Sequence, residues 1–94
     1  MITIRETNKL LDEKINKTLK EINEVELKAK DILYSQNRTV ESITESATNV
    51  MLVRKRYNAL NKLKKSILSI NNYDENKDST QKILIQVKDI LENL

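Results

Sequence analysis

The chain contains neither glycine nor proline in its 94 residues, and this double absence constrains the fold more than any other feature. Tight turns, bulges and sheet corners usually need one of the two, because glycine reaches backbone conformations that other residues avoid and proline fixes a turn. Lysine, glutamate, leucine and isoleucine are abundant, and all four are compatible with long helices. The sequence therefore predicts an all-α chain that forms a single helical domain over residues 1–94.

Apolar residues in the first third of the chain recur with a heptad period. With Ile15 and Ile22 at a positions, Val25 and Ile32 fall at d positions. A seam of this kind is typical of an amphipathic helix that packs along its whole length. Asn8 lies at an a position, where an amide side chain can set the register of a helix pair. We expect this helix to cover about residues 3–35.

Residues 35–39, Ser-Gln-Asn-Arg-Thr, are the first predicted break. Asn37 tolerates the left-handed conformation that ends helices, and Thr39 can cap the helix that follows. The heptad nevertheless continues through the break and places Ile43 and Val50 at a positions. Two architectures stay open: a long antiparallel helical hairpin with a shorter third helix, or one continuous helix through residue 37 with a C-terminal helix folded back on it.

A second helix is predicted over about residues 40–70, and its apolar stripe changes heading near Met51. From Leu52 onward the apolar face is defined by Val53, Leu60 and Ile67, turned by roughly a third of a circle from the earlier stripe. A helix with two apolar faces in series is expected to contact different neighbours along its length.

A polar segment, residues 71–77, separates this helix from a last one at about residues 79–94. Asp78 is the predicted cap of that helix, with Gln81 as its capping-box partner. The apolar face of the last helix is predicted to contain Ile83, Val87, Ile90 and Leu94, widened by Leu84 and Leu91.

The predicted core is thin, because three tyrosines are its only aromatic residues. Burial of aliphatic side chains contributes roughly 1.5–3 kcal/mol each, against a backbone entropy cost of roughly 1–2 kcal/mol per residue. Self-association as a homodimer is therefore expected. The core or oligomer seam is predicted to consist of Ile15, Ile22, Val25, Ile32, Ile43, Val50 and Met51.

Charge is concentrated in the middle of the chain. Residues 1–45 have net charge −1, residues 46–73 have +6 with no acidic residue, and residues 74–94 have −2, which together give the overall +3. On a helical wheel four of these cations share about 100° of arc away from the apolar face. They form the predicted partner-binding surface: Arg54, Lys55, Lys62 and Lys65. Pairing of the cations with the acidic flanks of the same molecule is the alternative interpretation.

Several kinds of chemistry lack their usual residues. The chain has no histidine, cysteine or glycine, so thiolate, imidazole and zinc chemistry and phosphate-cradling loops are not expected. We expect no catalytic activity, no cofactor and no metal site. No apolar run reaches the roughly 20 residues that span a bilayer, so no membrane partner and a cytoplasmic location are expected.

These features favour a small non-catalytic helical module that binds a protein by helix-face docking, as an adaptor, an inhibitor or an assembly factor. An acidic protein surface is the expected partner. A nucleic-acid-binding protein that uses the basic stripe is the alternative. The abundance of asparagine, isoleucine and lysine is typical of AT-rich genomes, which is compatible with a phage or mobile-element origin.

Overall fold

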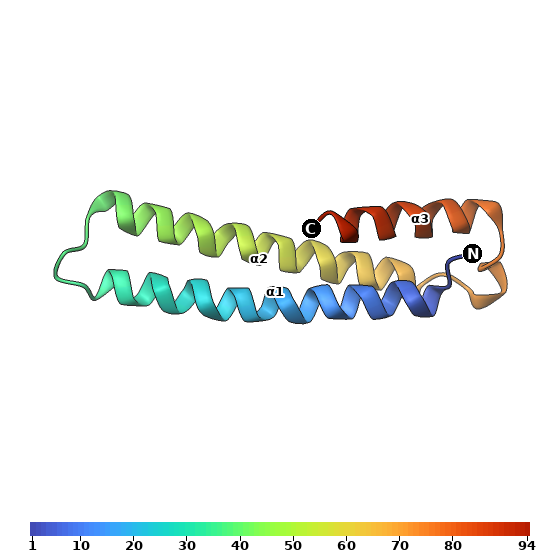
Figure 1. Cartoon of the computed structure of the whole chain (residues 1–94), viewed down its shortest axis with the longest axis horizontal. Coiled ribbons are helices and arrows are strands. Elements are labelled where there is room, and N and C mark those ends of the chain that lie inside the picture. The colour runs from blue at the N-terminus through green and yellow to red at the C-terminus, as the bar shows by residue number, and fades with distance from the viewer. The chain divides into compact units, whose positions relative to one another are not determined.

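The computed structural model describes the backbone of residues 1–94 and every side chain except that of Asn72. The chain forms three α-helices, α1 (Ile4–Leu33), α2 (Val40–Leu68) and α3 (Asp78–Glu92), with a short 3-10 helix at Asn72–Asp74 (Figure 1). Helices α1 and α2 form an antiparallel hairpin, and α3 is the shorter third helix. The predicted all-α hairpin is confirmed, and the continuous helix through residue 37 is wrong.

The turn between α1 and α2 forms without any left-handed residue, since no described residue has a positive φ. The expected left-handed Asn37 is therefore wrong. Its backbone N–H instead donates to the Ser35 hydroxyl at 3.2 Å. The Arg38 guanidinium donates to the Leu33 carbonyl at 3.1 Å, which places a cation at the C-terminus of α1, where the helix dipole favours it.

Helix α2 begins with a reciprocal cap. The Ser42 N–H donates to the Thr39 hydroxyl and the Thr39 N–H donates to the Ser42 hydroxyl, each at 3.0 Å. These two bonds use donors that the first turn of a helix leaves unpaired. The prediction that Thr39 caps this helix is confirmed.

The beginning of α3 differs from the prediction. Its N-cap residue is Lys77, which makes no side-chain capping bond, so the predicted cap by Asp78 with Gln81 is wrong. The Gln81 amide instead donates to the carbonyls of Ile2 and Glu75, at 2.8 and 2.7 Å, and accepts from the Ile2 N–H at 3.0 Å. Gln81 therefore holds the N-terminal residues against the loop that precedes α3.

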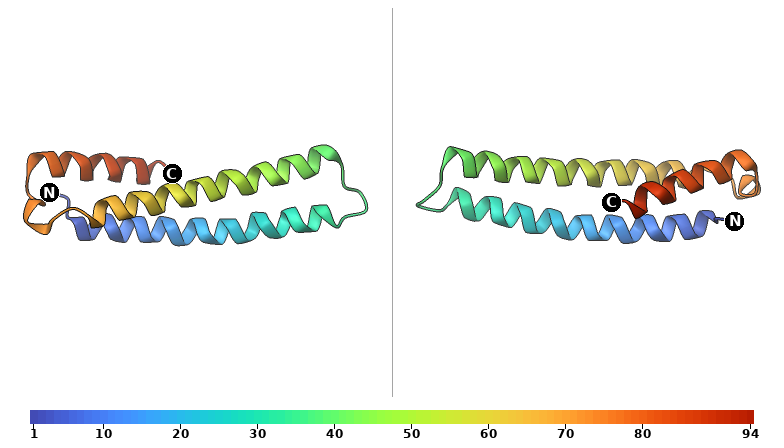
Figure 2. Two further views of the ribbon diagram at one scale, coloured as in Figure 1. Left: turned by 180° about the vertical axis from the view of Figure 1, so that it is seen from behind. Right: turned by 45° about the horizontal axis from the view of Figure 1, so that its top comes forward.

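The chain divides into two units by its internal contacts: unit 1 is Met1–Ile15 with Leu60–Leu94, and unit 2 is Asn16–Ala59. Unit 1 contains the beginning of α1, the end of α2 and all of α3, which lies beside the end of α2 in each view (Figure 2). It also contains most of the buried apolar side chains of the described chain: Ile4, Leu11, Ile15, Leu60, Ile67, Leu84, Val87 and Leu91.

Helix α3 buries one edge of its predicted apolar face rather than the centre of that face. Its buried residues are Thr80, Leu84, Val87 and Leu91. The predicted face residues Ile83, Ile90 and Leu94 are 48%, 55% and 50% exposed. Leu84 and Leu91, which were predicted to widen the face, are buried. The buried stripe shares Val87 with the predicted centre line and is rotated from it by roughly 60° about the helix axis. In this rotation the first turn of α3 places Gln81 within hydrogen-bond distance of Ile2 and Glu75.

Unit 2 is a two-helix hairpin whose interior is less covered. Ile22 and Val53 are buried, at 6% and 8% exposure. The other predicted seam residues of unit 2 on the facing sides of the helices, Val25, Ile32, Ile43 and Val50, are half-buried. Met51 is 61% exposed, so it lies outside the seam.

The buried side of α2 is one line of residues seven apart: Ser46, Val53, Leu60 and Ile67. The predicted change of heading near Met51 is therefore wrong. Ser46 occupies the seam position in the first half of the helix. Because serine is polar, a search for apolar periodicity does not include this position. The Ser46 hydroxyl is satisfied by donating to the Ile43 carbonyl at 3.0 Å.

Candidate functional site

The six cations of α2 fall into two groups, of which the first is paired with carboxylates of α1. In unit 2, Arg54 pairs with Glu26, and the Arg56 guanidinium lies 3.0 Å from the Glu21 carboxylate. In unit 1, Lys64 pairs with Asp12. The charges are largely exposed, so each pair contributes about 1 kcal/mol or less to folding. Half of the basic middle is thus neutralised within the chain.

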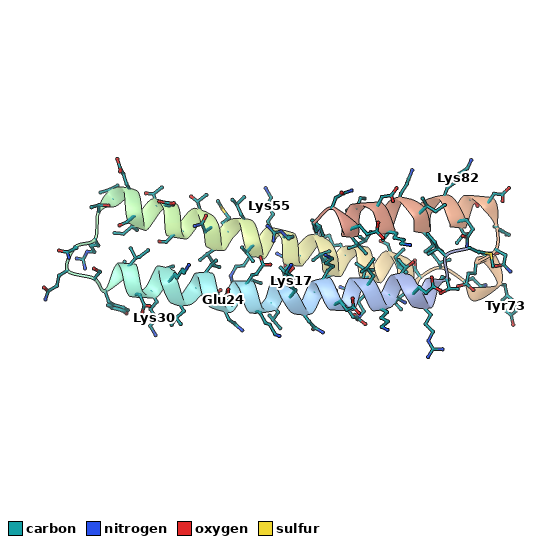
Figure 3. All side chains as sticks on the ribbon, in the orientation of Figure 1. Lys17, Glu24, Lys30, Lys55, Tyr73 and Lys82 are labelled. Carbon is teal, nitrogen blue, oxygen red and sulfur yellow. The ribbon has the colours of Figure 1, made fainter. Side chains whose placement is uncertain are left out.

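The second group consists of Lys55 in unit 2 and of Lys62 and Lys65 in unit 1. None of these three ammonium groups makes an ion pair with any side chain that the structure describes. Figure 3 shows the Lys55 side chain pointing away from α1. Three of the four predicted partner-binding residues are therefore exposed and unpaired. Arg54 differs from them because Glu26 holds it.

The exposed side of α2 in unit 2 combines apolar surface with Lys55. Met51 is 61% exposed and Leu52 is 54% exposed. Both residues line a shallow hollow of about 460 Å³. Its lining residues all belong to α2: Ala47, Val50, Met51, Leu52, Arg54, Lys55 and Asn58. We call Met51, Leu52 and Lys55 the outer α2 face. Since Val53 points into the hairpin, its neighbours on this face point to solvent.

A second surface of unit 2 lies between its two helices. A groove of about 200 Å³ is lined by residues of both, and we call it the seam groove: Val25, Lys28, Ile32, Ser42, Glu45, Ser46 and Asn49. Val25 and Ile32 were predicted for the seam. That Lys28 and Glu45 line the same groove was not predicted, because it follows only from the pairing of the two helices.

Unit 1 has a broad open depression of about 1180 Å³ beside the ends of α1 and α2, lined in part by Arg5, Asn8, Asp12, Ser69 and Glu75. Cations and carboxylates are mixed on it, so it favours no single charge class of ligand. The buried Asn8 Oδ1 has no hydrogen-bond partner among the described residues. An unpaired buried oxygen of this kind costs roughly 1–3 kcal/mol.

None of the helices in the described chain combines the length and apolar content needed to cross a bilayer. Comparison of the chain with protein-family models, with curated proteins and with solved structures finds no match. Inference about function therefore starts from the surfaces of the two units.

Proposed function

We propose that this chain is a non-catalytic helical module that binds a protein through the outer α2 face. The observation that carries this proposal is the exposure of Met51 and Leu52 beside Lys55, a cation that makes no ion pair with the described side chains. Apolar side chains in the middle of a contact supply most of its affinity, whereas charges at its rim guide the approach. The outer α2 face has both kinds of group on one helix, which suits helix-face docking.

The proposed partner is an acidic protein surface. No acidic residue occurs between positions 46 and 73, so no carboxylate within two turns along α2 offsets Lys55, Lys62 or Lys65. Unpaired charges of one sign produce a field that raises the rate of encounter with an opposite surface. The contact itself is expected at Met51, Leu52 and Lys55.

The pairing of Arg54, Arg56 and Lys64 with α1 carboxylates weakens the nucleic-acid alternative. Affinity for a nucleic acid grows with the number of phosphates that cations neutralise, and three cations of α2 remain unpaired within the described chain. Three such contacts give weak binding at physiological salt. Adaptor, inhibitor and assembly-factor roles all agree with a protein partner.

The test uses the whole chain as bait in an extract of the cells that make it, followed by kinetics on the purified captured protein. Met51→Ala is expected to weaken binding roughly tenfold, mainly through faster dissociation, because it removes buried contact area. Lys62→Glu with Lys65→Glu is expected to slow association and leave dissociation nearly unchanged. Lys30→Glu is the control, since Lys30 points from α1 away from α2 (Figure 3).

Two outcomes would contradict the proposal. Equal affinities for Met51→Ala, Lys30→Glu and the unaltered chain would place the contact elsewhere. Tight binding to a generic duplex DNA or RNA, with affinity that falls steeply as salt rises, would establish the nucleic-acid alternative. Fluorescence anisotropy with labelled oligonucleotides measures the second outcome directly.

We also propose that the chain self-associates as a homodimer. Its support is the thin interior of unit 2, in which Val25, Ile32, Ile43 and Val50 are only half-buried. Two-helix hairpins gain stability when a further helical layer covers their seam.

A further inference from the structure

Unit 2 buries far less apolar surface than unit 1. Of the ten buried apolar residues in the described chain, Ile22 and Val53 belong to unit 2 and the other eight to unit 1. In unit 1 a third helix covers the hairpin, whereas the described part of unit 2 has no helix besides its segments of α1 and α2. The seam groove, with Val25 and Ile32 half-buried in it, is where unit 2 lacks a covering layer.

Two residues of the α2 wall of the seam groove, Ser42 and Ser46, can be buried at small cost. Ser42 donates its hydroxyl to the Thr39 carbonyl and Ser46 donates its hydroxyl to the Ile43 carbonyl, both at 3.0 Å. Because these polar groups are already hydrogen-bonded, covering them leaves no donor without a partner. Both side chains are also small, so another helix can approach the backbone of α2 closely.

The two ionic groups of the seam groove have opposite signs and lie on different helices. Lys28 belongs to α1 and Glu45 belongs to α2, and both are exposed. Neither makes an ion pair with a described side chain. A partner of one charge sign would attract one of them and repel the other. A partner that suits both must present a carboxylate to α1 and a cation to α2.

We infer that the seam groove is the contact between two copies of this chain, in which Lys28 of each copy pairs with Glu45 of the other. This inference rests on the proposed self-association. In a two-fold contact the same face serves both copies, so the face must be complementary to itself. A cation on α1 and a carboxylate on α2 meet that condition when α1 of one copy lies over α2 of the other. Four helical segments then surround Val25 and Ile32, as in a helix bundle.

The test is a charge exchange followed by sedimentation equilibrium. Lys28→Glu and Glu45→Lys each place like charges opposite one another twice in a homodimer, so each variant is expected to dimerise roughly tenfold or more weakly. An equimolar mixture of the two variants restores both attractive pairs in a heterodimer. We expect the mixture to dimerise within a few fold of the unaltered chain. Lys30→Glu, which alters a nearby cation outside the groove, should change nothing.

The oligomeric state of the unaltered chain tests self-association, and the charge variants test the seam groove as its interface. If the unaltered chain is a monomer at high micromolar concentration, self-association is wrong and the groove contact with it. If the unaltered chain dimerises and Lys28→Glu and Glu45→Lys dimerise equally well, the homodimer stands and its interface lies elsewhere. If both variants are weakened and their mixture is not restored, the proposed pairing is overturned. Circular dichroism of each variant checks that helix content is retained.

Discussion

Gln81 joins parts of unit 1 that are distant in the sequence. Its amide makes two hydrogen bonds with Ile2, seventy-nine positions away, and one with the Glu75 carbonyl. Glu75 itself accepts the N–H of Ile4 at 2.6 Å, so a loop carboxylate caps the first turn of α1. Gln81 and Glu75 thus connect the N-terminus of α1 to the beginning of α3. The sequence predicts Gln81 only as a capping residue of α3 and does not indicate this long-range contact.

Replacing Gln81 by glutamate tests this link. A carboxylate can accept from Ile2 but cannot donate to the carbonyls of Ile2 and Glu75, so the variant should lose roughly 1–3 kcal/mol of unfolding free energy. Urea unfolding measures the change. Gln86→Glu, at an exposed position of the same helix, adds the same charge and is expected to stay within about 0.5 kcal/mol of the unaltered chain. Equal stabilities of the two variants would show that the Gln81 bonds contribute nothing.

At the scale of the element, α3 presents two apolar stripes and buries one. Leu84 is fully buried at 0% exposure, whereas the adjacent Ile83 is 48% exposed. The two side chains are isomers, which makes them a matched pair. Leu84→Ala should cost roughly 2–5 kcal/mol of unfolding free energy, and Ile83→Ala less than about 1 kcal/mol. Similar losses for both, measured by thermal or urea unfolding, would contradict the observed rotation of α3.

Leu84 and Ile83 also show that the sequence alone does not determine which apolar stripe of α3 is buried. The apolar period indicates that residues 79–94 form a helix, but it fits both stripes because Val87 belongs to each. The observed rotation is the one in which Gln81 bonds to Ile2 and Glu75, and neither partner can be identified from the sequence of the helix itself. The reason is different in α2, where the polar residue Ser46 occupies a buried position. A pattern that counts only apolar residues omits Ser46, and it placed the exposed Met51 in the seam.

Other elements were predictable because their signals are local. The heptad of α1 and the Thr39 cap of α2 arise within a few turns of the chain, and both helices begin close to the predicted residues. Partners distant in the sequence were not predictable in this way: Arg56 donates to Glu21, thirty-five positions away. The register of α1 against α2 places Glu26 beside Arg54 and leaves Lys55 without a described carboxylate partner. The sequence of either helix alone does not determine this register.

Across the described chain, some cations and apolar residues of α2 contact other parts of the protein, and others are exposed to solvent. Arg54, Arg56 and Lys64 pair with α1, while Lys55, Lys62 and Lys65 remain unpaired among the described side chains. The same division applies to apolar residues, since Val53 is buried and Met51 and Leu52 are exposed on the same helix. Groups left outside in this way are the ones proposed to bind a partner.

The most direct measurement of this proposal is site-specific photocrosslinking of the full chain in an extract of the cells that make it. A photoreactive phenylalanine analogue replaces either Met51, on the outer α2 face, or Lys30, which points away from α2 (Figure 3). We expect a discrete protein adduct from position 51 and none from position 30. The adduct should weaken when Lys55→Glu is added and when salt is raised. Equal adducts from the two positions, or an adduct from position 30 alone, would contradict binding through the outer α2 face.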